Sequence, residues 1–223
     1  MRNLVIVSAG TSQPSTTRML ADQIAAESVR RLRELGDDAT VRTVEVAPLA
    51  VDVARASVTG VPSAELHAAI EQIAAADAVI AATPVYKAGI SGLFKSFVDV
   101  LDDDLLIAKP VALAATAGSS RHALVVDDQM RSLFAYMRAL TLPTSVFAAP
   151  EDWGAAELGE RVRRAATELA VVIQSHVEQA IADRAWSGYR HEFGGNATRA
   201  EQTAADTDFD SPLMRLAAGG RVD

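Results

Sequence analysis

The sequence predicts an α/β protein with a doubly wound, five-stranded parallel sheet and helices on both faces. Short, continuous apolar runs alternate with longer amphipathic stretches, and this alternation occurs five times along the chain. The runs consist mainly of small and branched residues, which is typical of strands that are buried on both faces. Strands and helices in this order are joined by right-handed crossovers.

Five segments are expected to be strands. Most are continuous apolar runs, but one alternates Val41, Thr43 and Val46 with polar residues, which is typical of a strand at or near a sheet edge. In chain order the predicted strands are Leu4–Val7, Thr40–Val46, Val79–Ala82, Val111–Ala115 and Pro143–Phe147.

Apolar residues at spacings of three and four predict five helices between and after these strands. The first begins within a run of Ser and Thr and ends before Gly36, a common helix stop. The last is long and rich in alanine. In chain order the predicted helices are Thr16–Leu35, Ser63–Ala76, Ser91–Leu101, His122–Leu140 and Glu157–Arg184.

A chain of 223 residues is long enough for one domain with a sizeable core, and residues 1–185 are expected to form it. After about Ala185 the periodicity stops, and glycine pairs and scattered aromatic residues follow. Residues 186–223 are therefore expected to form a C-terminal arm that is partly disordered or that contacts another subunit.

Composition and charge exclude several classes of function. The net charge of −8 disfavours binding to nucleic acid or to an anionic membrane. The absence of cysteine excludes disulfides, thiolate nucleophiles and cysteine-based metal sites. No apolar stretch reaches about 18 residues, so no membrane span is expected. No cleavable signal pattern follows Met1, so the expected location is the cytoplasm.

In a sheet of this kind ligands bind outside the carboxyl ends of the strands, so the loops after the first, third and fourth strands form the expected site. The first of these loops carries six hydroxyl side chains and a glycine that permits a sharp turn. These residues are Ser8, Gly10, Thr11, Ser12, Ser15, Thr16 and Thr17. Hydroxyls and free amides at a helix N-terminus favour a bound monophosphate that requires no metal. Helix capping alone would need only one or two of these hydroxyls.

Two motifs of nucleotide-binding proteins are missing from this loop. The chain has neither a G-x-G-x-x-G fingerprint nor a Gly-Lys-[Ser/Thr] phosphate loop. The expected ligand is therefore neither a dinucleotide held in the usual way nor a nucleoside triphosphate.

The loop after the third strand offers an apolar wall. Thr83 lies at the end of that strand, Pro84 restricts the backbone, and Tyr86 adds a flat ring with a polar tip. Taken alone, this segment is also compatible with an ordinary strand-to-helix turn.

The loop after the fourth strand is a second turn that is rich in small donor residues. It consists of Thr116, Gly118, Ser119 and Ser120, followed by Arg121 and His122. The two basic residues are also compatible with an exposed helix start. Together, the three loops predict a pocket for a planar cofactor that carries a phosphate.

At these residues the sequence resembles the flavodoxin-like NAD(P)H-dependent FMN reductases. That family shows a first loop of the type G-S-x-R-x-x-S-x-N, then T-P-x-Y-x-x-x-x-x-G-x-L-K-x-x-x-D, then a glycine-rich turn. The second motif stands here as Thr83-Pro84-Val85-Tyr86, Gly92, Phe94-Lys95 and Asp99, with its spacing intact. The similarity covers the order of elements over roughly the first 175 residues. The stretch LFAYMRALTLPTSVFAAPEDW resembles the branch whose members accompany flavin-dependent monooxygenases.

The resemblance implies FMN as the cofactor and NADPH or NADH as the reductant. The phosphate is expected on the first loop, the ring against the second loop, and the third loop on the other side of the ring. The implied cofactor-binding residues are Ser8, Gly10, Thr11, Ser12, Ser15, Thr16, Thr17, Thr83, Pro84, Val85, Tyr86, Lys87, Thr116, Gly118, Ser119, Arg121 and His122. No side chain is assigned a catalytic role, and no metal is expected.

Two residues depart from the family pattern. Ser12 stands where the family has an arginine in the first loop. The phosphate charge must therefore be balanced by backbone amides, by the helix dipole, or by Arg18 or Arg121. Lys87 stands where the family often has Asn, so one contact to the flavin edge is lost or is replaced by a cation near the ring.

The implied activity is hydride transfer from NAD(P)H to FMN, which would supply reduced flavin to a partner monooxygenase. The flavin supplies the chemistry, and the protein supplies position and electrostatics. The alternatives are a quinone or azo reductase with bound FMN, a flavodoxin-like electron carrier, and a non-catalytic binding module. Members of the family usually dimerise, so a homodimer or homotetramer is expected.

Overall fold

The computed structural model describes residues 1–186, so the C-terminal arm predicted for residues 186–223 lies outside the described residues except for Trp186. The strands are β1 (Arg2–Ser8), β2 (Ala39–Glu45), β3 (Ala78–Tyr86), β4 (Gly89–Ile90), β5 (Pro110–Thr116), β6 (Leu140–Thr141) and β7 (Val146–Ala148). The α-helices are α1 (Thr16–Glu34), α2 (Ala50–Thr59), α3 (Ala64–Ala74), α4 (Gly92–Asp99), α5 (Arg131–Tyr136), α6 (Ala156–Gln174) and α7 (Val177–Ile181). Shorter turns are the 3-10 segments η1 (Ala47–Leu49), η2 (Ser120–His122) and η4 (Pro150–Asp152) and the π-helical segments η3 (Val126–Met130) and η5 (Ala182–Trp186).

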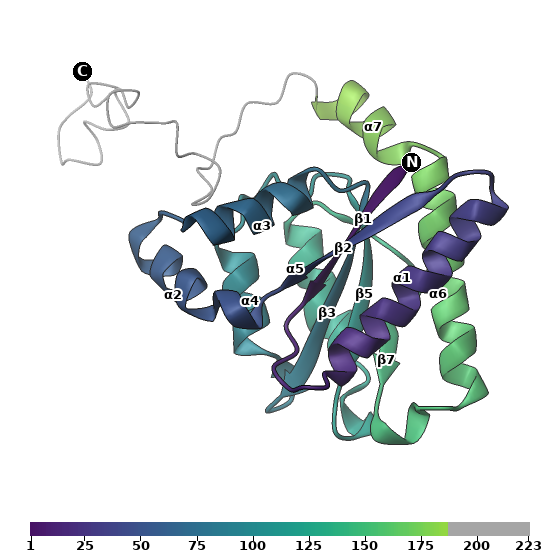
Figure 1. Ribbon diagram of the computed structural model, residues 1–223, viewed down its shortest axis with the longest axis horizontal. Coiled ribbons are helices and arrows are strands. Elements are labelled where there is room, and N and C mark those ends of the chain that lie inside the picture. The colour runs from purple at the N-terminus through teal and green to yellow at the C-terminus, as the bar shows by residue number, and fades with distance from the viewer. Residues whose placement is uncertain (187–223) are drawn as a thin grey trace, which may run out of the picture.

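The predicted doubly wound parallel sheet is confirmed. The strand order is β2-β1-β3-β5-β6, with β7 also paired to β5 in parallel and β4 paired to β3 in the antiparallel direction. Helices α1 and α6 pack side by side on one face, and α2 to α5 lie on the other (Figure 1). The parallel strands end at one edge of the sheet, where the loops after β1, β3 and β5 come together (Figure 1).

Side chains of the central strands alternate between two apolar cores, because successive residues of a strand point to opposite faces. In β1, Leu4 and Ile6 face the core under α1 and α6, whereas Val5 and Val7 face the core under α3 and α4. Burial on both faces explains why β1, β3 and β5 are continuous apolar runs in the sequence. Strand β2 pairs with β1 alone and is largely exposed, in agreement with its alternating pattern.

The single helix predicted for His122–Leu140 is wrong, because this segment is broken into η2, η3 and α5. The buried side chains Val126, Met130 and Phe134 follow at regular intervals of four residues. That spacing also fits an α-helix, so the apolar pattern continues across the change to the π-helical segment η3 and does not mark it.

The fifth predicted strand, Pro143–Phe147, is confirmed only at its end, where β7 begins at Val146, and the short strand β6 lies before the predicted range; both β6 and β7 pair with β5. Pro143 lies in the gap and has no amide to donate to a strand ladder. The guanidinium of Arg131 instead donates to the carbonyl oxygen of Leu142 at 2.8 Å, which satisfies the interrupted backbone. Helix α2, which ends at Gly60 with φ of 71°, has no counterpart among the predicted elements.

The long helix predicted for Glu157–Arg184 ends at Gln174, and α7 follows after a bend. His176 lies at the bend with φ of 51°, a left-handed conformation that a non-glycine residue seldom adopts. After the bend, Glu178 accepts a hydrogen bond from Nζ of the buried Lys109 at 3.0 Å. Tertiary contacts to the sheet therefore override the helical pattern at this point.

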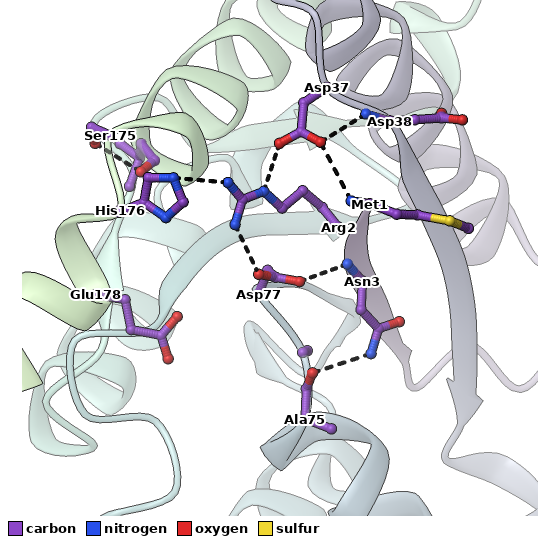
Figure 2. Close-up of polar contacts among 12 residues, drawn as sticks. Met1, Arg2, Asn3, Asp37, Asp38, Ala75, Asp77, Ser175, His176 and Glu178 are labelled. Atoms are coloured by element: carbon purple, nitrogen blue, oxygen red, sulfur yellow. Dashed lines mark hydrogen bonds and ion pairs between the residues drawn. The ribbon is translucent and has the colours of Figure 1, made fainter.

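A polar cluster at the amino edge of the sheet ties four segments together (Figure 2). The guanidinium of Arg2 donates to Asp37 at 2.7 Å and to Asp77 at 3.4 Å, and lies 3.0 Å from Nε2 of His176. Asp77 also accepts the backbone amide of Asn3 at 2.7 Å. The cluster holds the chain start and the α6–α7 bend at the edge opposite the three loops.

Within residues 1–186, none of the helices has the length and the apolar character that a bilayer crossing needs.

We expect the acid stability of the fold to depend on Arg2. The hydrogen bond from Arg2 is the main cause that holds the pKa of Asp37 below its ordinary value of 3.8. A lowered folded-state pKa adds stability above the unfolded value, and this stability is lost as the pH falls through the folded value. Arg2→Gln should therefore lower the Tm near neutral pH, and its difference from wild type should shrink below a pH of 3.8.

Thermal unfolding followed by circular dichroism from neutral to strongly acidic pH measures this effect. Lys95→Gln is the matched control, because it breaks an exposed pair with Asp99 and should leave the Tm almost unchanged. A difference between Arg2→Gln and wild type that stays constant at every pH would contradict the expectation.

Candidate functional site

The first loop is shaped by the close approach of Gly10 to the start of α1. A Cβ atom on Gly10 would lie 1.9 Å from Oγ of Ser15, so the backbone leaves room for glycine alone. Ser15 is the N-cap of α1, and its Oγ accepts a hydrogen bond from the amide of Arg18 at 3.2 Å. The hydroxyl of Ser15 is therefore used in building the loop.

A buried hydrogen bond joins the first loop to the third. Oγ1 of Thr17, in the first turn of α1, lies 2.7 Å from Oγ1 of Thr116 at the end of β5. The two residues are 2% and 5% exposed. Because β3 lies between β1 and β5, this bond spans the end of β3. It fixes the N-terminus of α1 against the third loop.

Strand β3 extends to Tyr86, past the end predicted at Ala82, so Thr83 lies within the strand, where its hydroxyl has a structural role. It is fully buried, and its Oγ1 accepts the amide of Ser91 at 3.2 Å and donates to the carbonyl oxygen of Pro84 at 3.0 Å. Ser91 in turn caps α4 by accepting the amide of Phe94 at 3.1 Å. The hydroxyl of Thr83 thus holds β3, β4 and α4 together.

Strands β3 and β4 form a hairpin that carries Tyr86. Its two-residue turn, Lys87-Ala88, has positive φ at both positions, 51° and 64°, as hairpin turns that match the strand twist require. The Lys87 side chain is exposed. Tyr86 is half exposed, and its hydroxyl lies 3.0 Å from Oγ1 of Thr11, so the second loop also contacts the first.

The side chain of Gln129, in the π-helical segment η3, holds this hairpin by hydrogen bonds to the hairpin's backbone. Its Oε1 accepts the amide of Ile90 at 3.1 Å, and its Nε2 donates to the carbonyl oxygen of Ala88 at 3.3 Å. A Cβ atom on Gly89 would lie 3.2 Å from Oε1 of Gln129, so glycine allows the close approach.

The three loops enclose one cavity of about 240 Å³, which we call the three-loop cavity. Its lining combines hydroxyl groups from the first loop and the N-terminus of α1 with an apolar ledge from the end of β3. Its lining residues are Gly10, Thr11, Ser12, Thr16, Thr17, Pro84, Val85, Tyr86, Thr116, Ala117, Gly118 and Pro150.

None of the residues that line the three-loop cavity carries a charge. Arg18, one of the two arginines considered as a phosphate partner, lies outside it and pairs with Asp22 and Glu45, each at 2.7 Å. An anion in the cavity would therefore be held by hydroxyls, by backbone amides and by the dipole of α1.

Several predicted residues lie outside the three-loop cavity. Arg121 and His122 line a separate cavity of about 540 Å³ beside the β3–β4 hairpin, which we call the hairpin-side cavity. Ser8 and Ser15 line a third cavity, on the β2 side of the first loop. Their proposed contacts with the cofactor stay predictions.

The third loop is tied to the loop that follows β7. The Oγ of Ser119 accepts the amide of Arg121 at 3.2 Å, which caps η2, and the amide of Ser120 donates to Glu151 at 3.3 Å. Hydrogen bonds from its own backbone amide and from Ser120 hold the pKa of Glu151 below its usual value. The carboxylate therefore remains ionised as a fixed acceptor for this turn.

Three residues near the cavity were not indicated by the sequence. Ala117 and Pro150 line it, and Gln129 positions the hairpin. Pro150 follows β7, which pairs with β5, so the strand order could have indicated it. Gln129 lies in a segment expected to be a regular helix and had no recognisable signal.

No group of three or more potential metal-ligating side chains occurs among residues 1–186.

Comparison with known sequences identifies similar proteins. A family model described as NADPH-dependent FMN reductase matches residues 1–154. SfnE of Pseudomonas putida, named an NADH-dependent FMN reductase, is 37% identical over 189 residues, covering 78% of this chain and 94% of SfnE. A protein of Pseudomonas aeruginosa named FMN reductase (NADPH) is 37% identical over 174 residues, covering 75% of this chain and 90% of its own.

Two similar solved structures are also oxidoreductases. An oxidoreductase from Corynebacterium diphtheriae is 44% identical with a TM-score of 0.76, covering 78% of this chain and 98% of that one. The apo form of EmoB, an NADH:FMN oxidoreductase, is 27% identical with a TM-score of 0.68, covering 77% of this chain and 89% of that one.

We expect the Thr17–Thr116 hydrogen bond to contribute measurably to stability. Thr17→Val should lower the free energy of unfolding by about 1–3 kcal/mol, because the buried hydroxyl of Thr116 loses its partner. The double variant Thr17→Val/Thr116→Val should recover most of this loss, since two apolar groups of the same shape then face each other. Urea unfolding of the protein without ligands measures both. A double variant whose loss equals the sum of the two single losses would contradict the expectation.

Proposed function

Because the chain belongs to the NADPH-dependent FMN reductase family, we propose that its three-loop cavity binds FMN and releases reduced FMN to a separate flavin-dependent monooxygenase. The chain is an NAD(P)H-dependent flavin oxidoreductase that uses FMN. The proposal concerns the position of FMN in the three-loop cavity and the monooxygenase that receives the reduced FMN.

The observation that carries the proposal is the meeting of two kinds of surface in one cavity. A helix N-terminus with the exposed hydroxyls of Ser12 and Thr16 suits a phosphate. The ledge of Pro84, Val85 and Tyr86 suits a flat ring. The residues present therefore fit FMN, and no carboxylate among the lining residues would repel its phosphate.

Bound FMN supplies the hydride chemistry, and the chain supplies position and electrostatics. Thr17 and Thr116 hold the phosphate side and the opposite turn at a fixed separation. Gln129 keeps the hairpin, and with it Tyr86, against the cavity. Ala117 and Gly118 of the third loop line the cavity, and their backbone amides would be available to stabilise negative charge on the reduced ring.

Release of the reduced cofactor is supported by the uncharged lining. A phosphate held without a side-chain cation lacks the strongest kind of hydrogen bond available to it. The exposed positions of Thr11, Ser12, Thr16 and Gly118 leave the cavity open to solvent. Both features favour exchange of FMN over permanent retention.

A homodimer or homotetramer in the cytoplasm remains a prediction. Val58, Leu124 and Tyr136 are large apolar side chains that are 87%, 77% and 68% exposed, and a second copy of the chain could cover them. This observation supports an oligomer but does not select its size.

The proposed function predicts that the purified protein quenches the fluorescence of added FMN and oxidises NADH or NADPH only when FMN is present. Free FMN should be a better electron acceptor than a quinone, because reduced FMN is the product that leaves. Steady-state loss of absorbance of the nicotinamide measures both reactions. A protein that reduces quinones while holding its FMN would contradict the release step.

The placement of the phosphate has its own test. Ser12→Ala combined with Thr16→Ala should weaken FMN binding by about 1–3 kcal/mol, because two hydrogen bonds to a charged group are removed. Riboflavin, which has the ring but lacks the phosphate, is the matched control and should bind both proteins equally. An equal loss for FMN and riboflavin would show that these hydroxyls do not contact the phosphate.

A further inference from the structure

A second cavity, of about 420 Å³, lies on the other side of the first loop, and we call it the β2-side cavity. It shares Gly10, Thr11 and Ser12 with the three-loop cavity, so the two are separated by one loop. Its lining residues are Ser8, Gly10, Thr11, Ser12, Gln13, Pro14, Ser15, Arg18, Met19, Glu45, Ala47 and Pro48.

The β2-side cavity contains one carboxylate at a defined place in the sheet. Glu45 is the last residue of β2, so its side chain lies at the carboxyl end of the strand next to β1. Its Oε1 accepts a hydrogen bond from Arg18 at 2.7 Å. The Glu45 side chain is 57% exposed and therefore has acceptor capacity left for a ligand.

The charges at this cavity disfavour a phosphate. Arg18 is the lining residue with positive charge, and it is shared between Glu45 and Asp22. One guanidinium against two carboxylates leaves a net negative charge. A ligand group that donates hydrogen bonds is favoured here, and an anionic group is repelled.

The remaining walls suit a flat, apolar ring. Met19 on α1 and Ala47 and Pro48 after β2 offer aliphatic surface, and the thioether of methionine adapts well to aromatic rings. In dinucleotide-binding α/β folds with a glycine fingerprint, a carboxylate accepts hydrogen bonds from the ribose hydroxyls of adenosine; this chain lacks the fingerprint, but Glu45 at the end of β2 offers the same acceptor chemistry.

We propose that the β2-side cavity binds the adenosine half of the nicotinamide dinucleotide, with Glu45 accepting hydrogen bonds from its ribose hydroxyls, and that Glu45 thereby selects NADH over NADPH. This inference rests on the proposed function, since it requires the dinucleotide to reach a ring bound in the three-loop cavity. The extra phosphate of NADPH would lie against Glu45, where like charges repel. Arg18 cannot compensate while both carboxylates occupy it.

Kinetics of a single variant test the selection. Glu45→Gln removes the negative charge and releases Arg18, so the ratio of kcat/KM for NADPH to that for NADH should rise about tenfold or more. Glu34→Gln is the matched control, because it removes an exposed carboxylate that pairs with Arg30 and Arg31 on the same helix, away from Arg18 and from the cavity lining. Its ratio should stay close to that of wild type.

Binding without turnover gives an independent measurement. Calorimetric titration of the FMN-saturated protein with ADP-ribose should show binding, and 2′-phospho-ADP-ribose should bind more weakly. Glu45→Gln should reverse this order. A wild-type preference for NADPH, an unchanged ratio in Glu45→Gln, or equal affinity for the two fragments would overturn the inference.

The two proposals fail in different ways. If the wild-type protein does not bind FMN in the three-loop cavity, the proposed function fails, and riboflavin and FMN titrations report this without any dinucleotide. If FMN binds and NADH is oxidised but Glu45→Gln changes neither the cofactor ratio nor the binding of ADP-ribose, only the inference about the β2-side cavity fails.

Discussion

The buried hydrogen bond between Thr17 and Thr116 is the constraint on which the site depends. It connects the helix after β1 to the end of β5 across the intervening strand β3, at 2.7 Å and away from water. The hydrogen bond holds the first and third loops at a fixed separation, and the ledge of Pro84 and Tyr86 lines the cavity together with them. The parallel sheet brings the loops to one edge, and this contact turns that neighbourhood into a cavity of defined width.

The chemistry of the three-loop cavity follows from the absence of charged side chains among its lining residues. Its polar groups are neutral hydroxyls and peptide dipoles, and the nearby Arg18 is paired with carboxylates on the far side of the first loop. A neutral lining gives direction to a phosphate without a strong ionic hold. This balance favours the release of reduced FMN that we propose, because tight retention of the phosphate would oppose it.

The periodicity of the sequence identified the sheet, its edge strand and the three loops, because burial on both faces leaves a pattern that does not depend on distant contacts. It did not find the breaks at η3, at Pro143 or at His176, where the side chains of Gln129, Arg131 and Arg2 make hydrogen bonds between segments that are distant in the sequence or separated by a turn. Arg121 lies in η2, the first part of the broken helix, and lines the hairpin-side cavity and not the three-loop cavity. The composition of the first loop predicted a phosphate site. It could not indicate that the hydroxyls of Ser15 and Thr83 are hydrogen-bonded to the backbone amides of Arg18 and Ser91, because these bonds depend on the folded loops.

Gln129 holds the β3–β4 hairpin by its main chain alone, through the amide of Ile90 and the carbonyl of Ala88. The clamp itself needs only the glycine at position 89, which lets it approach, whereas the positive φ at Lys87 and Ala88 restricts the turn to residues that tolerate the left-handed conformation. Within that restricted set, the side chains of Lys87 and Ala88 can change while Gln129 keeps the ledge in position. The exposed surface at this tip is in this way separated from the hydrogen bonds that hold the wall of the three-loop cavity.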